Sequence, residues 1–460
     1  MEAQSLEPNL LVEEFLDVDY DAVAGAVDES WMSRRMTHSQ LVETARGAVG
    51  GGASSSSSKR VSRAVGMVPT PAQGSTSVPW PRRTMEQGAP APPVITSEMV
   101  EAIEAEDAVG NPDSPPGPAA SAFIRQLSAW KDRLSTFFGL SSTCLASNLR
   151  SAAHRIRARI SFLPRERVER VMNIIQNGYL IPLLSAPPPF HRSHNSPDLS
   201  EHKIAAWQAL RKDIGHGAVL PCDLPRQGKP SIVSPVRTAP KGWRTGKRRF
   251  VVNLRYLNRF IPDEDCTCDL ETLAKVRNLF EYSPEVASRT WFFSMDLSSG
   301  YHNFWIHPSQ WHLLGIALHV SELPPEAVTY LREHFPNCED RASGNFYFLM
   351  RALPFGLGPS CAVFSDVITA LAAAWRRHEV CRRPVRLTSY IDDFLPMAHS
   401  VRASLILIIE LVYEATATGL TLQVEKCRLF PATRIKYVHV LVRTSHFVPR
   451  VLPVANSHPH

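Results

Sequence analysis

Apolar residues recur at helical spacing in the segment that begins at residue 121. Several apolar side chains share one face after Pro164, which suits the first helical position, and Gly178 suits the C-terminal cap. Proline is favoured in the first turn of a helix and glycine just past the last turn. A second helix is expected over residues 200–214. We therefore predict a helical N-terminal extension over residues 121–220. The inward-facing residues of the two helices are expected to be Val168, Val171, Met172, Ile175, Ile204, Trp207 and Leu210.

Beyond residue 220, short apolar runs that are typical of strands alternate with helical segments. A basic loop, residues 241–247, joins the first two of these runs. The expected strands are residues 232–236, 249–254, 291–297, the two halves of 387–395, 420–424 and 435–442, and the expected helices are residues 359–375 and 403–417. Helices packed on an antiparallel sheet make an α+β fold, which we predict over residues 221–455.

The first 120 residues lack this periodicity. Residues 54–58 are a run of serine behind three glycines, and proline recurs from residue 69 to residue 118. Such a composition buries too little apolar surface to offset the entropy cost of ordering the chain. We predict that residues 1–120 are largely disordered.

The net charge of +6 is unevenly distributed. Residues 224–262 contain ten Arg or Lys and no acidic residue, whereas the first thirty residues contain nine Asp or Glu and no Arg or Lys. The basic stretch favours a polyanionic partner. The acidic N-terminus is unlike a signal peptide, and apolar runs such as residues 405–409 are too short to span a membrane. We expect an intracellular protein without a membrane segment.

Three carboxylates stand at the ends of predicted strands. Asp392 and Asp393 form a turn between two apolar runs, and Asp296 ends another run. Adjacent like charges at a partly buried turn raise each other's pKa unless a cation neutralises them, and hard oxygen ligands suit Mg²⁺. An Asp-Asp pair alone is typical of a solvated turn. With Asp296 and the Gly/Pro-punctuated segment 352–360, the pattern favours a two-metal phosphoryl-transfer centre with two Mg²⁺ ions, or alternatively Mn²⁺.

Three segments in order resemble the successive palm motifs of reverse transcriptases: MDLSSGYH at residues 295–302, LPFGL at 353–357 and YIDD at 390–393. The wording is most similar to that of LTR-type retrotransposons of the Ty3/gypsy group or the related DIRS group. The resemblance implies the fingers and palm of a right-hand polymerase, with helices packed on an antiparallel palm sheet. The implied activity is RNA-directed DNA polymerase, which adds dNTPs to a primer 3′-hydroxyl on an RNA or DNA template.

The same resemblance implies the catalytic residues. Asp296 and Asp392 match the family's metal-bridging carboxylates, and Asp393 matches the adjacent aspartate that supports the site. Lys426 matches the lysine proposed to protonate the pyrophosphate as a general acid. A lysine before a strand is, however, often merely exposed.

The resemblance also implies a nucleotide site. Lys241 and Arg249 match the fingers residues that grip the incoming triphosphate, although Lys247 could take the place of Lys241. Tyr301 matches the steric gate that collides with a 2′-hydroxyl, where the alternative is a plain core tyrosine. The residues implied to shape the nucleotide pocket are Phe355 and Gly356.

The pattern departs from the family near the C-terminus. Residues 436–440 (KYVHV) replace the usual Phe-Leu-Gly wording of the primer grip, and about twenty residues follow. We therefore expect a thumb and an RNase H domain to be absent. The alternative function is a truncated, weak or inactive retroelement remnant that only binds nucleic acid. A viral RNA-dependent RNA polymerase is disfavoured by Tyr301 and Tyr390. The choice between Ty3/gypsy and DIRS, the template preference and the oligomeric state stay open.

Overall fold

The structure is a computed structural model. It describes residues 85–109, 115–141, 144–240, 248–268, 290–376, 386–391, 393–424, 426–437, 440–443 and 450–453, all within one compact unit, Ser77–His460. In these segments no helix is both long and apolar enough to cross a membrane. Lys241 and Asp392, two of the predicted site residues, lie outside the described residues.

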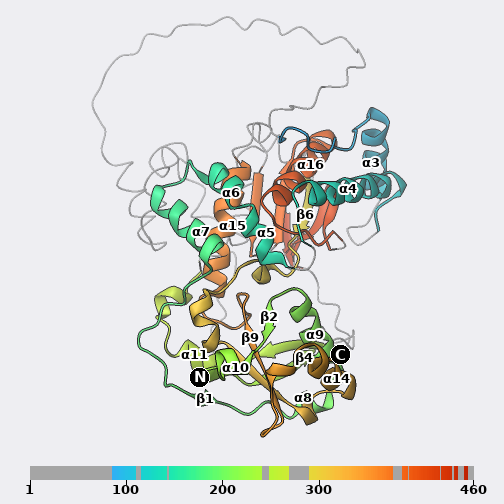
Figure 1. The fold of residues 1–460 in the computed structure, drawn as a ribbon. Helices are drawn as coiled ribbons and strands as arrows, with labels where there is room; N and C mark the ends of the chain where they lie inside the picture. The colour runs from blue at the N-terminus through green and yellow to red at the C-terminus, as the bar shows by residue number, and fades with distance from the viewer. Residues whose placement is uncertain are drawn as a thin grey trace, which may run out of the picture. The chain divides into compact units, whose positions relative to one another are not determined.

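A four-stranded antiparallel sheet carries the predicted palm motifs, in the strand order β10–β11–β6–β12 (Figure 1). The apolar run that ends at Asp296 forms its central strand β6, as expected. The strands are β6 (Trp291–Asp296), β10 (Arg386–Tyr390), β11 (Asp393–Ala398) and β12 (Arg428–Ala432). The α+β fold with fingers and palm is therefore confirmed.

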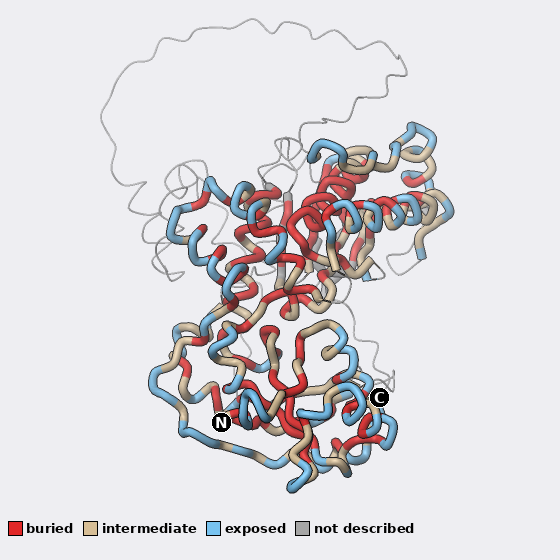
Figure 2. The backbone as a smooth tube through the Cα atoms, viewed as in Figure 1, coloured by how far each residue is buried: buried red, intermediate tan, exposed pale blue. Residues whose placement is uncertain are grey.

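Two long helices follow the strand motifs, and both begin and end close to the predicted positions: α15 (Ser360–Arg376) and α16 (Val401–Ala417). Ser400 caps α16, because its hydroxyl accepts a hydrogen bond from the backbone N–H of Ala403. Fourteen of the seventeen residues of α16 are buried (Figure 2). A helix that is buried all round needs cover on more than one face.

The N-terminal helices supply that cover. The first two, α3 (Ser97–Val109) and α4 (Pro118–Phe137), pack on α16. The next three are α5 (Leu145–Ser151), α6 (Ala153–Ile160) and α7 (Arg165–Asn177), of which α6 and α7 pack on α15 (Figure 1). The helical extension is thus part of the same core as the palm sheet.

Ordered structure begins before residue 120, because α3 lies inside the region predicted to be largely disordered. The sequence of α3 is rich in acidic residues, so it did not predict this helix. One of these acids has a structural use: Glu106 accepts hydrogen bonds from the backbone N–H groups of Ala119 and Ala120 at the start of α4. Exposed N–H groups at a helix N-terminus favour such an anion.

A second sheet and a hairpin form the part of the chain expected to be the fingers. The sheet has the order β1–β3–β7–β9–β2, with β8 paired to β9. Its strands are β1 (His191–Arg192), β2 (Val219–Pro221), β3 (Ile232–Val233), β7 (Gly315–His319), β8 (Glu339–Asp340) and β9 (Asn345–Met350). The hairpin pairs β4 (Val236–Pro240) with β5 (Arg248–Val252). The strand expected over residues 232–236 is wrong in its bounds, because residues 232–233 form β3 in the second sheet and β4 begins only at Val236.

Short helices surround these strands: α8 (Asp198–Glu201), α9 (Lys203–Gly215), α10 (Leu224–Gln227), α11 (Arg255–Asn258) and α14 (Pro325–His334). The predicted inward face of α9 is wrong at one residue, since the side chain of Ile204 is 58% exposed. The buried residues are Ala206, Trp207 and Leu210. At 100° per residue, this stripe leaves Ile204 at its edge.

Two further strand predictions are wrong. Residues 420–424 form only an isolated bridge, between Leu422 and Leu297, because the chain turns there. Residues 435–442 are two antiparallel strands instead of one, β13 (Arg434–Tyr437) and β14 (Val440–Arg443), and β15 (Arg450–Pro453) adds a third. Apolar alternation alone does not show where a chain reverses.

Candidate active site

Two of the predicted carboxylates lie opposite each other on adjacent strands of the palm sheet. Asp296 ends β6 and Asp393 begins β11, and the two are direct partners in the antiparallel register. Directly opposite residues project their side chains on the same face, with Cβ atoms about 4.5–5.5 Å apart. Like charges in this position repel, so the pair favours a cation between them.

The turn before Asp393 is strained. Tyr390 pairs with Asp393, and Ile391 begins the short connection between them. Ile391 has a φ of 55°. Positive φ suits the primed turns of tight hairpins, but it is rare for a β-branched residue. Strain of this kind costs about 1–3 kcal/mol and gathers at functional sites.

Lys426 lies beside the carboxylate of Asp296. Its Nζ is 3.6 Å from Oδ1 of Asp296, and the lysine side chain is half exposed whereas that of Asp296 is 17% exposed. The structure therefore brings together three predicted catalytic residues, Asp296, Asp393 and Lys426.

A turn of 3₁₀ helix, η4 (Gly300–Asn303), presents Tyr301. Ser299, just before it, adopts the left-handed conformation with φ of 47°. The buried amide of Asn303 donates hydrogen bonds to three successive backbone carbonyls, those of Ser298, Ser299 and Gly300, at 3.1, 3.5 and 2.9 Å. Asn303 thus holds the turn from inside.

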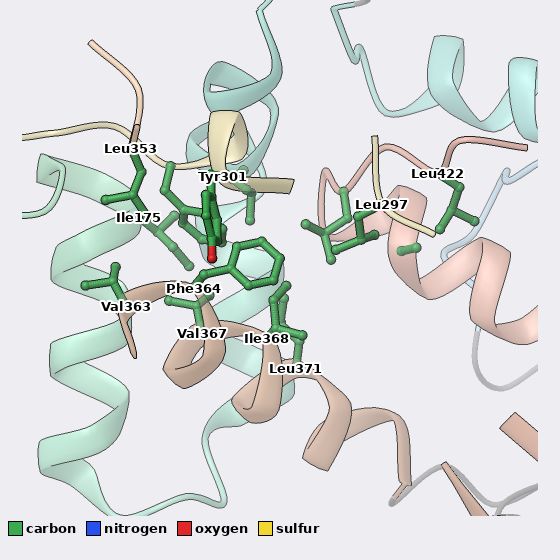
Figure 3. Packing of buried hydrophobic residues seen from close by; sticks show 14 of the residues in the cluster. Ile175, Leu297, Tyr301, Leu353, Val363, Phe364, Val367, Ile368, Leu371 and Leu422 are labelled. Atoms are coloured by element: carbon green, nitrogen blue, oxygen red, sulfur yellow. The ribbon is translucent and has the colours of Figure 1, made fainter. Parts of the chain in front are cut away.

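Aromatic rings surround Tyr301. Its ring centroid is 4.6 Å from that of Phe355 and 5.2 Å from that of Phe364 on α15. Figure 3 shows the side chain of Tyr301 pointing toward Phe364. The side chain of Phe355 is 64% exposed, whereas Tyr301 is only 8% exposed. The two residues predicted to bind nucleotide therefore meet, one at the surface and one below it.

Gly356 follows Phe355 in an exposed turn with φ of 91°, a conformation that favours glycine. Asn258 clamps this turn on both sides, since its amide donates to the carbonyl of Gly356 at 2.9 Å and accepts from the N–H of Gly358 at 3.1 Å. The sequence did not indicate this contact.

Arg249 stands apart from these residues. It lies on β5, opposite Ala239, with an exposed side chain. Among the described residues it makes no hydrogen bond or ion pair, so its guanidinium is available to a ligand.

The donor set near Asp296 fits a hard divalent cation in its chemistry, because it consists of carboxylate oxygens. In the described part of the chain, no three His, Cys, Asp or Glu side chains gather as a metal-binding group. The third member of the predicted triad, Asp392, is outside that part.

A partly buried histidine follows Tyr301. Nδ1 of His302 is 3.8 Å from Oδ1 of Asp213 on α9. Burial lowers the pKa of His302 to about 4, and burial raises the pKa of Asp213 to about 6. His302 is therefore neutral at pH 7, and this contact is not an ion pair there.

Comparison with known proteins agrees with the motif order. Residues 235–441 match the family model "Reverse transcriptase (RNA-dependent DNA polymerase)". No curated protein matches the sequence.

Solved structures of foamy virus proteins are similar at 12–13% identity. A protease-reverse transcriptase in complex with double-stranded DNA gives a TM-score of 0.39 over 63% of this chain and 46% of the other. A protease-reverse transcriptase from prototype foamy virus gives 0.41 over 68% and 35%. The complex with an RNA/DNA hybrid gives 0.39 over 63% and 35%. This chain spans about a third to a half of the length of those proteins. From the family match, the chain contains a reverse transcriptase domain over residues 235–441.

Proposed function

We propose that this protein is the RNA-directed DNA polymerase of a retrotransposon of Ty3/gypsy or DIRS type. It joins a dNTP to a primer 3′-hydroxyl on an RNA or DNA template. The observation that carries the proposal is the pairing of Asp296 with Asp393 on adjacent strands, with Lys426 Nζ 3.6 Å from Asp296. The family match over residues 235–441 supports it.

Each residue has a role in this reaction. Asp296, Asp392 and Asp393 would hold two Mg²⁺ ions, which polarise the attacking hydroxyl and the leaving pyrophosphate when bound. Lys426 is half exposed, so its ammonium can reach the leaving group and donate a proton. The 3′-oxygen attacks the α-phosphorus as its hydroxyl proton passes to water. The bond from that phosphorus to the bridging oxygen of pyrophosphate breaks, and the leaving oxygen takes the proton from Lys426.

The nucleotide is held at two places. Arg249, and Lys241 or Lys247 in the basic loop, grip the triphosphate, because guanidinium and ammonium groups suit phosphate oxygens. Tyr301 and Phe355 face the sugar and base, and the bare backbone of Gly356 allows close approach.

The test is primer extension on poly(rA)/oligo(dT) with Mg²⁺. We expect extension by the wild type, and a loss of roughly 10²–10³-fold in Asp296→Asn and in Asp392→Asn, the size typical for removal of a preorganised electrostatic group. Asp132→Asn is the control, since that side chain is 77% exposed on α4.

Full activity in the Asp296 and Asp392 variants would overturn the assignment. A folded wild type that binds the primer-template in a salt-dependent manner but does not extend it would identify the alternative, a retroelement remnant that only binds nucleic acid.

A further inference from the structure

Asp296 lies where the regular pairing of β6 with β12 stops. The last regular pair is Arg428 with Ser294, and the register of the two strands is irregular. In a continuing antiparallel ladder the next partner of Asp296 would be residue 426. The chain turns at that point instead, so the backbone of Asp296 needs other partners.

The thiol of Cys427 takes the place of the missing strand. The backbone N–H of Asp296 donates to Sγ of Cys427 at 3.1 Å. The thiol in turn lies 3.6 Å from the carbonyl oxygen of Asp296, within reach of a weak S–H donor bond. The same carbonyl accepts a second bond, from the N–H of Gln423 at 2.9 Å.

These bonds fix the direction of the Asp296 side chain. In an antiparallel strand, the N–H and C=O of one residue point to the same neighbour. Because those of Asp296 point to the 423–427 turn, its pair with Asp393 is of the non-hydrogen-bonded kind. In such a pair the Cα atoms are only about 4.5 Å apart and the side chains are closest.

Lys426 and Cys427 contact Asp296 at two different points. Nζ of Lys426 approaches the carboxylate, whereas Sγ of Cys427 contacts the backbone. A shift of Cys427 therefore moves the carboxylate and the lysine relative to each other.

We propose that Cys427 is a positioning residue, whose thiol bridges the N–H and C=O of Asp296 and so aims its carboxylate toward Asp393. The proposal rests on the proposed function, because the direction of the Asp296 carboxylate matters only if that carboxylate takes part in the polymerase reaction. Groups that orient metal-binding side chains typically affect metal affinity or activity by 10–100-fold.

The experiment compares wild type, Cys427→Ala and Cys427→Ser in primer extension. We expect Cys427→Ala to lower kcat roughly 10–100-fold, with KM for dTTP within about twofold and a higher Mg²⁺ concentration at half-maximal rate. Serine keeps a donor and an acceptor at this position, so Cys427→Ser should recover most of kcat. Cys144→Ala is the matched control, because its Sγ also accepts a hydrogen bond, from Ser147, but at the start of α5.

A second readout does not depend on polymerisation. Mg²⁺ should raise the melting temperature of the wild type above its value in NaCl of equal ionic strength, since a ligand of the folded state stabilises it. Cys427→Ala and Asp296→Asn should both lose this shift, and Cys144→Ala should keep it. If the wild type shows the shift but no extension, the proposed polymerase function fails while the positioning role stands.

The proposal is overturned if folded Cys427→Ala keeps the wild-type kcat and Mg²⁺ shift, or if Cys427→Ser is as impaired as Cys427→Ala. It is also overturned if the wild type shows neither extension nor a Mg²⁺ shift. If Cys427→Ala does not fold, the folded wild type is treated with N-ethylmaleimide instead, because this reagent modifies thiols. Modification should then lower kcat and the Mg²⁺ shift, with Cys427→Ser resistant, and equal sensitivity of the two proteins would refute the role.

Discussion

Tyr301 is fixed from two directions. Its backbone belongs to the turn that Asn303 holds through three carbonyls, and its ring packs between Phe355 and Phe364. A residue anchored in this way cannot swing aside at little cost, because each buried contact would be lost. Such rigidity suits a steric gate.

We predict that Tyr301→Val relaxes the selection against ribonucleotides. The ratio of kcat/KM for dTTP to that for UTP should fall by about tenfold or more, equivalent to about 1.4 kcal/mol of lost discrimination. Tyr301→Phe keeps the ring and should keep the ratio. Both values come from single-nucleotide extension. If Tyr301→Val keeps the wild-type ratio and remains folded, Tyr301 is a core residue only.

At this scale the sequence predicts chemistry better than contacts. Asp296, Asp393 and Lys426 could be placed together because strand ends and motif order position them. The contacts of Asn258, Asn303 and Cys427 were not predictable, since these side chains bond to backbone groups: Asn258 to the turn at Gly356, Asn303 within its own turn and Cys427 to the end of β6. Nothing in a residue's type shows which carbonyl or N–H it will meet after folding.

At the scale of elements, the last turn of α9 carries an unfavourable charge. Asp213 is partly buried there, near the negative end of the helix dipole. Burial raises the pKa of its carboxyl from 3.8 to about 6, while Lys212 lowers it by a smaller amount. The neighbouring imidazoles of His216 and His302 have lowered pKa values, so they give Asp213 no counter-charge at neutral pH.

We predict that Asp213→Asn stabilises the protein at high pH. A raised carboxyl pKa means that the folded chain holds the extra proton between about pH 4 and 6, so wild-type stability falls as pH rises through that window. The loss in the free energy of unfolding caused by ionised Asp213 is complete above pH 6 and is at most about 3 kcal/mol. Urea unfolding should show a gain of about 2–3 kcal/mol at pH 8 and only about 1 kcal/mol at pH 4.5. Equal gains at both pH values would contradict a raised pKa.

An element that the sequence predicted well is α7, which has an apolar stripe and ends at Gly178. The failures have a common cause. Residues 420–424 and 435–442 are apolar enough for strands, but the pairing that decides between strand and turn is made with distant segments.

At the scale of the whole described chain, the N-terminal helices are tied to the palm by buried charge. Arg159 on α6 donates to the carboxylate of Glu414 on α16, and the two side chains are 19% and 4% exposed. Arg155 on the same helix donates to the carbonyl of Ala417 and packs over the ring of Phe138. The carboxylate of Glu414 holds the pKa of Arg159 above its usual value despite burial. Sequence could not reveal this link, because 255 positions separate the partners.

We predict that this pair couples the helical extension to the palm as one folding unit. Arg159→Met or Glu414→Leu alone should lower the free energy of unfolding by about 3–5 kcal/mol, since each leaves a buried charge without its partner. The double variant should recover most of the loss, because two apolar side chains replace two buried charges. Arg157→Met is the control on α6: its pair with Glu169 is about half exposed, and such pairs contribute about 0–1 kcal/mol.

Urea unfolding of the wild type and these variants, followed by both tryptophan fluorescence and far-UV circular dichroism, measures the double-mutant cycle. Coincident transitions in every variant indicate one unit. Additive losses in the double variant, or a separate early transition of the helices, would show that the extension folds independently of the palm.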